Sequence, residues 1–524
     1  METLHILNDV IFNHYFLIGG LFLSYLVYRI LHALFGDNNY LQTKYRSRGH
    51  TWRSIQCNKS IPYNIYCTVC GKLMLPLIGL FCECCGVSAC KRCRRVVDKK
   101  FRCKQFTWPV DKQFHHHWVH IGNSRAEHSD NNDDTIRKYY CCWCQRTKLC
   151  HDSAFNDSEQ CDFLKYRKIM IPPACVQVEN GVVTGIKPPT FPDWEPLFIF
   201  ANRKSGSNRS DEVLSLFRGL LNPIQVVDMA ETAPESVVRW MPPRARVLVA
   251  GGDGTVAWVL NVLHAAPHVK ASVAILPMGT GNDLSRVLGW GAGLASHLDA
   301  QAIIEDVQHA EEQLLDRWKI TIKPTRGRLR SRGRERVMYM YNYASIGVDA
   351  QVALDFHRAR SQFLYRYGSR MLNYMAYVLM GAGRAIDSRC DGLEQRLRVR
   401  LDARDPIPLP PIQALVVLNI PSWGAGVQLW NMGNEGDVEE QSISDGKIEV
   451  VGISSSFHIA RLQCGLAEPY RFAQASQIKI ELEGCCAMQV DGEPWVQRSA
   501  TVLVEPAGQC RVLRKCTHYT HTVE

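Results

Sequence analysis

Residues 246–291 read RVLVAGGDGTVAWVLNVLHAAPHVKASVAILPMGTGNDLSRVLGWG and contain two strand–loop–helix patterns in succession. Residues 247–250 are a short apolar run of the kind found in buried parallel strands, and the glycines that follow end it. From Thr255 the apolar residues fall at helical spacing, which predicts an amphipathic helix that opens directly from the loop. Residues 273–277 repeat the strand, and a second helix is expected from Leu284 onward.

Both loops have the composition of a phosphate site. A helix N-terminus leaves backbone N–H groups unpaired, and glycine lets an anion approach them closely. We expect a nucleotide to contact Gly251, Gly252, Gly254, Thr255, Gly279, Thr280, Gly281 and Asn282. Asp253 and Asp283 lie inside the loops, where a carboxylate repels bare phosphate unless a divalent cation or a substrate hydroxyl mediates. One such loop is more often an ordinary tight connection, but two on successive units favour a polyphosphate site.

The pair GGDGT and PMGTGND resembles the lipid-kinase branch of a superfamily that also contains phosphofructokinases, NAD kinases and sphingosine kinases. Within that branch, PMGTGNDLSRVLGWG is most similar to the diacylglycerol kinases. The resemblance implies an α/β ATP-binding domain over residues 192–330, with Asp253 and Asp283 in the catalytic machinery. Residues 197–206, LFIFANRKSG, resemble the N-P-K-S-G segment of that family, which implies that Lys204 meets a phosphate. By itself Lys204 is equally an ordinary surface lysine.

Residues 337–507 are β-rich and resemble the accessory half of diacylglycerol kinases, a sandwich whose face closes the active cleft. In Asp491-Gly492-Glu493 two carboxylates flank one glycine at the end of an expected strand. By resemblance to bacterial lipid kinases, Glu493 would be the general base and Asp491 its partner. Asp445 is a weaker candidate for a Mg²⁺–water network. Without the family, Asp-Gly at this position indicates a surface hairpin turn.

Composition limits the classes of protein to consider. The 524 residues are 46% apolar, enough for two to four domains with real cores. A net charge of +10 favours an anionic partner such as a membrane surface or a nucleotide. The basic residues are not interleaved with stacking aromatics, so nothing favours nucleic acid. Fourteen of the 21 cysteines lie within residues 57–161, mostly in CxxC pairs, which favours zinc over a secreted disulfide scaffold.

Residues 50–103 have the cysteine and histidine spacing of the C1 domain, a small fold with two interleaved zinc sites. The resemblance implies that one Zn²⁺ is bound by His50, Cys82, Cys85 and Cys103, and the other by Cys67, Cys70, Cys90 and Cys93. Disulfides or unliganded buried cysteines are the alternative. Residues 116–161 resemble a second copy that has lost half its ligands, because the CxxC expected after its histidine is missing. We expect at most one zinc there, bound by His117, Cys141, Cys144 and Cys161.

Residues 10–35 form the one segment apolar enough for a membrane. The charge-free run over residues 15–28 has 14 residues, about 21 Å as a helix, and only the extended segment approaches the hydrocarbon thickness of about 30 Å. Lys44, Arg46 and Arg48 follow it, which predicts that the rest of the chain is cytosolic. A buried or re-entrant helix that never spans is the alternative. The sequence leaves open which membrane it enters.

The sequence therefore predicts a multidomain chain: an anchoring helix, two zinc domains, the catalytic domain, the accessory domain and a tail over residues 508–524. This order resembles the epsilon-type diacylglycerol kinases. The implied activity is ATP-dependent phosphorylation of 1,2-diacylglycerol to phosphatidic acid at a membrane, with ATP, Mg²⁺ and Zn²⁺ as cofactors. That reaction ends diacylglycerol signalling and feeds phosphoinositide metabolism. The alternatives are a catalytically inactive diacylglycerol receptor or scaffold, and a ceramide or sphingosine kinase.

Overall fold

The computed structural model describes residues 49–54, 66–74, 79–125, 135–150, 159–203, 209–325, 334–361, 390–433 and 439–516. The chain divides into two compact units, one of residues 1–105 with 115–160 and the other of residues 106–114 with 161–524. None of the described helices is long and apolar enough to cross a bilayer. The expected anchor, residues 10–35, lies outside the described residues.

The first unit contains two small antiparallel sheets of three strands each. The first sheet is formed by β1 (Trp52–Ser54), β2 (Gly79–Cys82) and β3 (Ser88–Cys90), and α2 (Arg94–Lys100) follows it. The second sheet is formed by β4 (Trp118–Arg125), β5 (Thr135–Cys141) and β6 (Thr147–Cys150). The two sheets use the same register, since Trp52 pairs with Cys82 and Trp118 with Cys141. Sheets this small bury too little apolar surface to be stable alone, so cross-links between the strands must contribute.

The second unit begins with two short 3-10 helices and a hairpin and continues into a parallel sheet with strand order β10-β9-β11-β12. The lead-in comprises η2 (Leu164–Tyr166), η3 (Pro173–Cys175), β7 (Val176–Glu179) and β8 (Val182–Ile186). The strands are β9 (Leu197–Ala201), β10 (Val226–Asp228), β11 (Arg244–Gly251) and β12 (Lys270–Pro277). The helical segments are α3 (Ser210–Leu220), η4 (Pro223–Gln225), α4 (Pro234–Val238), α5 (Asp253–His264), α6 (Asp283–Val287) and α7 (Ala300–His309). β9 is buried at every residue, as expected for a strand with helices on both faces.

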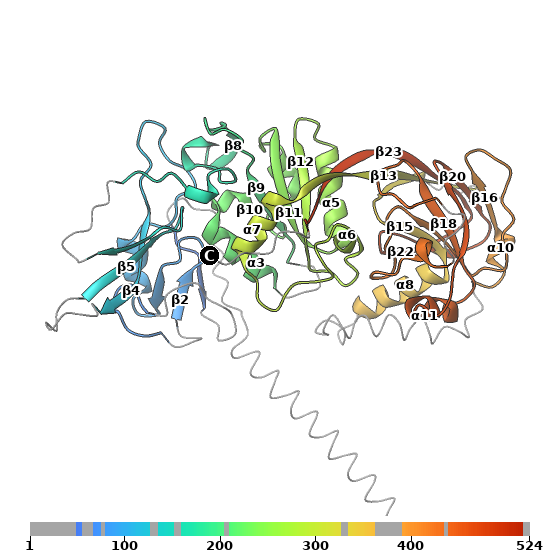
Figure 1. Cartoon of the computed structure of the whole chain (residues 1–524), viewed down its shortest axis with the longest axis horizontal. Coiled ribbons are helices and arrows are strands. Elements are labelled where there is room, and N and C mark those ends of the chain that lie inside the picture. The colour runs from blue at the N-terminus through green and yellow to red at the C-terminus, as the bar shows by residue number, and fades with distance from the viewer. Residues whose placement is uncertain are drawn as a thin grey trace, which may run out of the picture. The chain divides into compact units, whose positions relative to one another are not determined.

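Two long strands join this parallel sheet to the C-terminal half of the unit. β13 (Glu311–Pro324) and β23 (Ala500–Arg514) pair antiparallel along almost their whole length, and β23 also pairs with β12. Figure 1 shows both strands extending from the α/β half to the β-rich half. The prediction of a tail from residue 508 was therefore wrong for residues 508–514, which are sheet residues between β12 and β13. Their alternation of buried and exposed residues is that of a strand with one covered face.

The C-terminal half is a sandwich of two sheets. One is the continuation of the large sheet, made of β13, β14 (Arg336–Met340), β23, β20 (Ile478–Leu482) and β16 (Leu397–Leu401). The other has the order β19-β18-β17-β15-β21-β22, with β15 (Tyr343–Gly347), β17 (Ala414–Leu418), β18 (Ile448–Ile453), β19 (Tyr470–Ala475), β21 (Cys486–Val490) and β22 (Glu493–Gln497). Val399 and Val502 from the first sheet share one buried core with Val416 and Val450 from the second. Inward-facing β-branched residues of both sheets thus fill the space between them.

The described residues of this half also form the helical segments α8 (Val348–Ser361), α10 (Leu393–Arg396), η8 (Leu429–Asn431) and α11 (Ser456–Gln463). α8 packs on β21 and β22, and this contact places one face of α8 beside the Asp491–Glu493 turn. Figure 1 shows α8 and α11 on the same side of this sheet. The packing brings residues from α8, β14 and β22 close to the glycine loops of the α/β half.

Gly347, the last residue of β15, lies very close to the backbone of Gln413 and Ala414. Its φ of +116° is accessible only to glycine, and a Cβ there would lie 2.0 Å from the Gln413 carbonyl oxygen. G347A should therefore lower the free energy of unfolding by several kcal/mol or prevent folding, since both strain and overlap oppose it. G291A is the matched control, because Gly291 has a φ of +89° but open space around it. It should cost only about 1–2 kcal/mol, and equal losses in urea unfolding of the two variants would contradict the steric explanation.

Candidate active site and zinc centres

The two glycine loops contact each other at the carboxyl ends of β11 and β12. A Cβ on Gly279 would lie 2.7 Å from the Cα of Gly252, so only glycine at both positions permits this approach. Gly252 caps the N-terminus of α5 in an extended conformation. Asn282 adopts a left-handed conformation, and its side-chain oxygen accepts the Gly279 amide at 2.9 Å. The N-termini of α5 and α6 therefore open beside each other, as an anion site requires.

The loops form one wall of a cavity of about 920 Å³ between the α/β half and the sandwich. The α/β half contributes Asn202, Gly252, Asp253, Gly254, Thr255, Ala257, Trp258, Asn261, Gly279, Thr280, Gly281 and Asp283. The sandwich half contributes Met338, Tyr339, Asn342, Tyr343, Asp349, Ala353, His357, Gly424, Ala425, Gln489, Val490, Asp491, Gly492 and Glu493. The cavity thus has a polar region around the glycine loops, and β14, β15 and α8 form a mixed wall that contains Met338, two tyrosines, Ala353, Asp349 and His357.

Asp253 lies half-buried at the first turn of α5 and accepts three hydrogen bonds. Its oxygens accept the backbone amides of Asp283 and Leu284, each at 3.3 Å, and the side-chain amide of Asn342 at 3.0 Å. Asp253 therefore connects the N-terminus of α6 to the start of β15 and still lines the cavity. A carboxylate in this position can supply a hard oxygen ligand to a divalent cation that accompanies phosphate.

Asp283 is buried and contacts the sandwich half directly. Its carboxylate accepts the hydroxyl of Ser422 at 2.5 Å and the amides of Ala425 and Gly426, both at 3.1 Å. Burial, and then the neighbouring Asp253, raise the pKa of Asp283 to about 7. Oδ1 accepts all three of these bonds and Oδ2 accepts the Ala425 amide at 3.4 Å, so Asp283 chiefly holds residues 422–426 against the glycine loop.

Asp491 and Glu493 lie in the turn between β21 and β22 and have different surroundings. Asp491, with φ of +48°, accepts the backbone amides of residues 341, 342 and 343 at 2.8, 2.8 and 3.1 Å. Burial raises its pKa to about 7. Glu493 is exposed and lines the cavity, and none of the described residues donates a hydrogen bond to its carboxylate. A Cβ on Gly254 would lie 3.6 Å from the Glu493 Oε1, so this carboxylate faces the phosphate end of the cavity.

Two predicted residues are not brought to the cavity by the described structure. Lys204 lies outside the described residues. Asp445 lies in an exposed turn, accepts the Lys447 amide at 3.0 Å and does not line the cavity. Sequence reasoning missed Asn342 and Asn202, whose side-chain amides contact Asp253 and Thr255 respectively. Asn202 follows a fully buried parallel strand, which is a usable signal, whereas nothing in the sequence near Asn342 distinguishes it.

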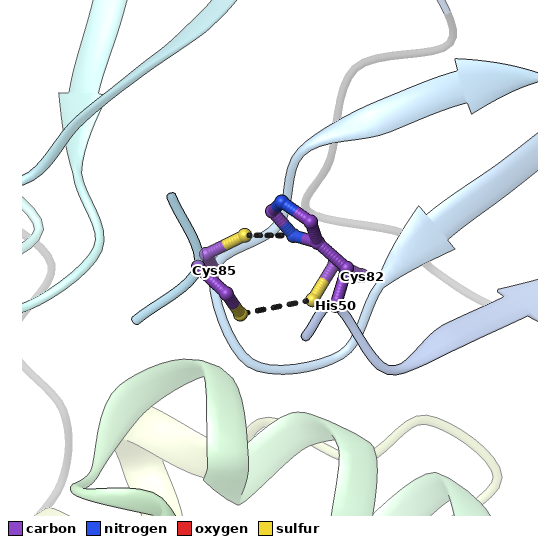
Figure 2. A group of neighbouring side chains, drawn as sticks. His50, Cys82 and Cys85 are labelled. Carbon is purple, nitrogen blue, oxygen red and sulfur yellow. Dashed lines mark hydrogen bonds between the residues drawn. The ribbon is translucent and has the colours of Figure 1, made fainter. Parts of the chain in front are cut away.

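The cysteine-rich unit contains both ligand sets expected for its first domain. The ligand atoms of His50, Cys82, Cys85 and Cys103 lie within 4.8 Å of one another, and so do those of Cys67, Cys70, Cys90 and Cys93. Figure 2 shows His50 facing Cys85, whose Sγ is 3.4 Å from the His50 Nδ1, with Cys82 beside them. The His50 Nε2 contacts the Phe101 carbonyl oxygen at 3.2 Å, which leaves Nδ1 for a metal. Four such donors fit tetrahedral zinc in both sets.

The second domain brings together one further set, and its histidine corrects the prediction. His116, not His117, lies within 4.8 Å of the ligand atoms of Cys141, Cys144 and Cys161. The His116 Nδ1 is 3.4 Å from the Cys144 Sγ, which is the distance found between His50 and Cys85. Neighbouring residues of an extended chain point in opposite directions, so an error of one residue selects the wrong side chain. The signal was available, because both ligand histidines stand two residues before a tryptophan, Trp52 or Trp118.

The fold and the cavity define a protein with a paired glycine-loop site between an α/β half and a β-sandwich half. Comparison with protein families makes this specific. Residues 196–312 match the diacylglycerol kinase catalytic domain, and residues 339–494 match the diacylglycerol kinase accessory domain. The two matches together cover slightly more than half of the 524 residues. By these two domains the chain belongs to the diacylglycerol kinase family.

Curated relatives extend the comparison over different lengths of chain. "Diacylglycerol kinase theta" of Mus musculus is 39% identical over 336 residues, which are 62% of this chain and 36% of that protein. "Probable diacylglycerol kinase 3" of Caenorhabditis elegans is 28% identical over 514 residues, 88% of this chain and 64% of that protein. The chain therefore spans between about a third and two thirds of these relatives. A crystal structure of a diacylglycerol kinase from Bacillus anthracis aligns with 62% of this chain and 98% of its own, at 15% identity and a TM-score of 0.37.

The histidine assignment predicts the zinc content of variants. The three ligand sets should bind three zinc ions per purified full-length chain. H116A should lower the content by one ion, because it removes one of four donors, while H116C should restore it through a thiolate. H117A is the control and should keep all three. Elemental analysis of protein purified without chelator tests this, and loss of zinc from H117A but not from H116A would contradict the assignment.

The raised pKa of Asp283 predicts how stability varies with pH. The folded chain holds the proton of the Asp283 carboxyl more tightly than the unfolded chain does, where the pKa of aspartate is about 3.8. Its favourable contribution is therefore complete below about pH 4 and is lost as the pH rises through about 7. D283N does not ionise, so relative to wild type its melting temperature should increase between pH 5 and pH 8 without added Mg²⁺. D445N, a change in an exposed turn, is the control. A difference in melting temperature between D283N and wild type that stays constant from pH 5 to pH 8 would contradict the assignment.

Proposed function

We propose that this protein transfers the γ-phosphate of ATP to the free hydroxyl of 1,2-diacylglycerol, which yields phosphatidic acid and ADP. The observation that carries the proposal is the single cavity in which the paired glycine loops and the exposed carboxylate of Glu493 face each other. Membership of the diacylglycerol kinase family supplies the substrate class. The relatives bear the same name, and the chain covers only part of their length.

The arrangement of the cavity assigns a role to each group. The amides at the N-terminus of α5 and in the Gly279 loop bind the phosphates of the nucleotide. Asp253, with Glu493 nearby, would hold the Mg²⁺ that offsets phosphate charge when it is bound. Glu493 accepts the proton of the lipid hydroxyl as that oxygen bonds to the γ-phosphorus and the bond to ADP breaks. Asp491 orders residues 341–343 and thereby the contact between Asn342 and Asp253.

The predictions that the sequence makes about zinc domains, a membrane anchor and the subtype extend this proposal. The two zinc domains would be of the C1 type, and zinc would stabilise their small sheets. Residues 10–35 would attach the chain to a membrane with the catalytic unit in the cytosol, close to a water-insoluble substrate. This arrangement, with an N-terminal anchor and two zinc domains, supports an epsilon-type member of the family. The zinc domains would then position the catalytic unit, whether or not they bind diacylglycerol themselves.

Two other functions can be distinguished by one assay. An inactive diacylglycerol receptor would have no need for four carboxylates around a phosphate loop, so the intact cavity argues against it. A ceramide or sphingosine kinase shares the glycine loop but would phosphorylate a sphingoid alcohol. Full-length protein in mixed micelles, incubated with labelled ATP and Mg²⁺ and each of the three lipids, separates these possibilities. Label in diacylglycerol alone supports the proposal, and label in a sphingoid lipid or in none contradicts it.

E493Q should lower kcat for diacylglycerol by about 10²–10⁴-fold, because the amide cannot accept the hydroxyl proton. Its melting temperature should stay near that of wild type, since the Glu493 carboxylate is exposed to the cavity. E311Q changes an exposed carboxylate at the start of β13, outside the cavity, and should leave kcat unchanged. A kcat for E493Q within about threefold of wild type would exclude Glu493 as the general base.

A further inference from the structure

Arg317 of β13 is a buried arginine whose partners are all uncharged. It is 6% exposed and lies against the ring of Tyr339, with its guanidinium carbon 3.3 Å from the ring centroid. Its nitrogens donate to the side-chain oxygen of Asn261 at 3.1 Å, the Tyr341 hydroxyl at 3.1 Å and the Ala507 carbonyl at 3.4 Å. Within the described part of the chain no carboxylate forms an ion pair with it. A buried cation is usually paired with an acid, so its neutral surroundings call for an explanation.

The contacts of Arg317 fix the orientation of the Asn261 amide. The Asn261 Oδ1 accepts from Arg317 and also from the Tyr341 hydroxyl at 2.9 Å. With its oxygen held in this way, the Nδ2 group is directed away from Arg317. Asn261 is half-buried and lines the cavity, and none of the described residues accepts a hydrogen bond from its Nδ2. The Nδ2 group of Asn261 is therefore available to a ligand in the cavity that this residue lines.

Aspartate at position 261 would suit the fold better than asparagine. It would keep the oxygen that Arg317 and Tyr341 contact, and it would give the buried guanidinium a carboxylate partner. The one contact it would lose is the donor that faces the cavity. A less stabilising residue is expected at a position where a ligand needs a group that only this residue supplies. The ligand must therefore offer a hydrogen-bond acceptor to Nδ2.

The position of Asn261 in the cavity indicates which ligand group accepts the hydrogen bond from its Nδ2. Asn261 follows Gly254 by seven residues on the same face of α5, about 10 Å along the helix axis. Around it the wall is aromatic, with Trp258 on α5 and Tyr339 on β14. Asn261 belongs to the α/β half, and its contact with the Tyr341 hydroxyl holds it where that half meets the sandwich half, which carries Glu493. A lipid whose hydroxyl meets Glu493 then extends its ester groups and acyl chains along this wall.

We infer that Asn261 is a binding residue for the acceptor lipid and that its Nδ2–H donates to an ester carbonyl of diacylglycerol. The inference rests on the proposed function and adds the group that recognises the ester linkage. Arg317 and Tyr341 are positioning residues, because they act only through the orientation of the amide. A neutral amide distinguishes an ester carbonyl from an ether oxygen, which is a weaker acceptor and carries no carbonyl group.

The test is N261D in the full-length protein, because this variant keeps the oxygen and replaces only the donor. We expect its melting temperature to equal or exceed that of wild type. Its KM for dioctanoylglycerol should rise at least about tenfold, because a carboxylate repels the ester carbonyl, while its KM for ATP stays unchanged. Wild type should prefer dioctanoylglycerol to the dioctyl ether analogue, and N261D should lose most of that preference. N431D, an exposed Asn-to-Asp change outside the cavity, is the matched control and should behave as wild type.

Three outcomes decide the matter. A rise in the KM for ATP with an unchanged KM for the lipid would assign Asn261 to the nucleotide and overturn the inference. Unchanged KM values and an unchanged preference for ester over ether would overturn it as well. A wild-type protein that phosphorylates no diacylglycerol would instead refute the proposed function, so the two failures are separate.

Discussion

The antiparallel pairing of β13 with β23 is the constraint on which the second unit depends. These strands belong to the α/β half at one end and to the sandwich at the other, and β23 joins the large sheet beside β12. A continuous ladder of backbone hydrogen bonds bends and twists but does not allow its two ends to separate freely. The carboxylate turn of the sandwich is therefore held opposite the glycine loops. The cavity is a consequence of this shared sheet and not of a flexible hinge between two independent domains.

Four aspartates and one glutamate line the cavity, and their surroundings separate their roles. Asp283 of the α/β half is occupied by a hydroxyl and amides of the sandwich half, whereas Asp491 is occupied by amides within the sandwich half itself, and burial raises the pKa of each to about 7. Asp283 therefore joins the two halves, and Asp491 orders the segment that leads into β15. None of the described residues makes such a contact with Glu493, which lies beside Gly254 of the first glycine loop, and this suits a group that accepts a proton. Carboxylate groups thus hold segments of the chain together in one place and remain available to accept a proton in another, according to what each carboxylate contacts.

The cysteine-rich unit is subject to a different constraint, the stability of sheets too small to have a core of their own. Each domain repeats one arrangement, in which a histidine precedes a tryptophan by two residues and that tryptophan pairs with the first cysteine of a CxxC. The second domain keeps this set among its described residues, and its sequence is polar and lacks cysteine where the other CxxC would stand. Four-donor metal sites stabilise such sheets with few residues, because the bonds to the metal replace the missing apolar burial.

Patterns that act over a few residues were readable from the sequence alone. Glycines after a buried strand indicated both phosphate loops, and the spacing of His50 and its cysteines indicated two ligand sets that the structure brings together. These succeed because backbone conformation and ligand spacing are local properties. The tertiary structure decided the rest: the choice of His116 over its neighbour, the insertion of residues 508–514 into the sheet, and the contact of Asp283 with Ser422 139 residues away. Each of these depends on which distant segment a side chain or strand meets, and that is set by the packing of the whole core and not by any local pattern.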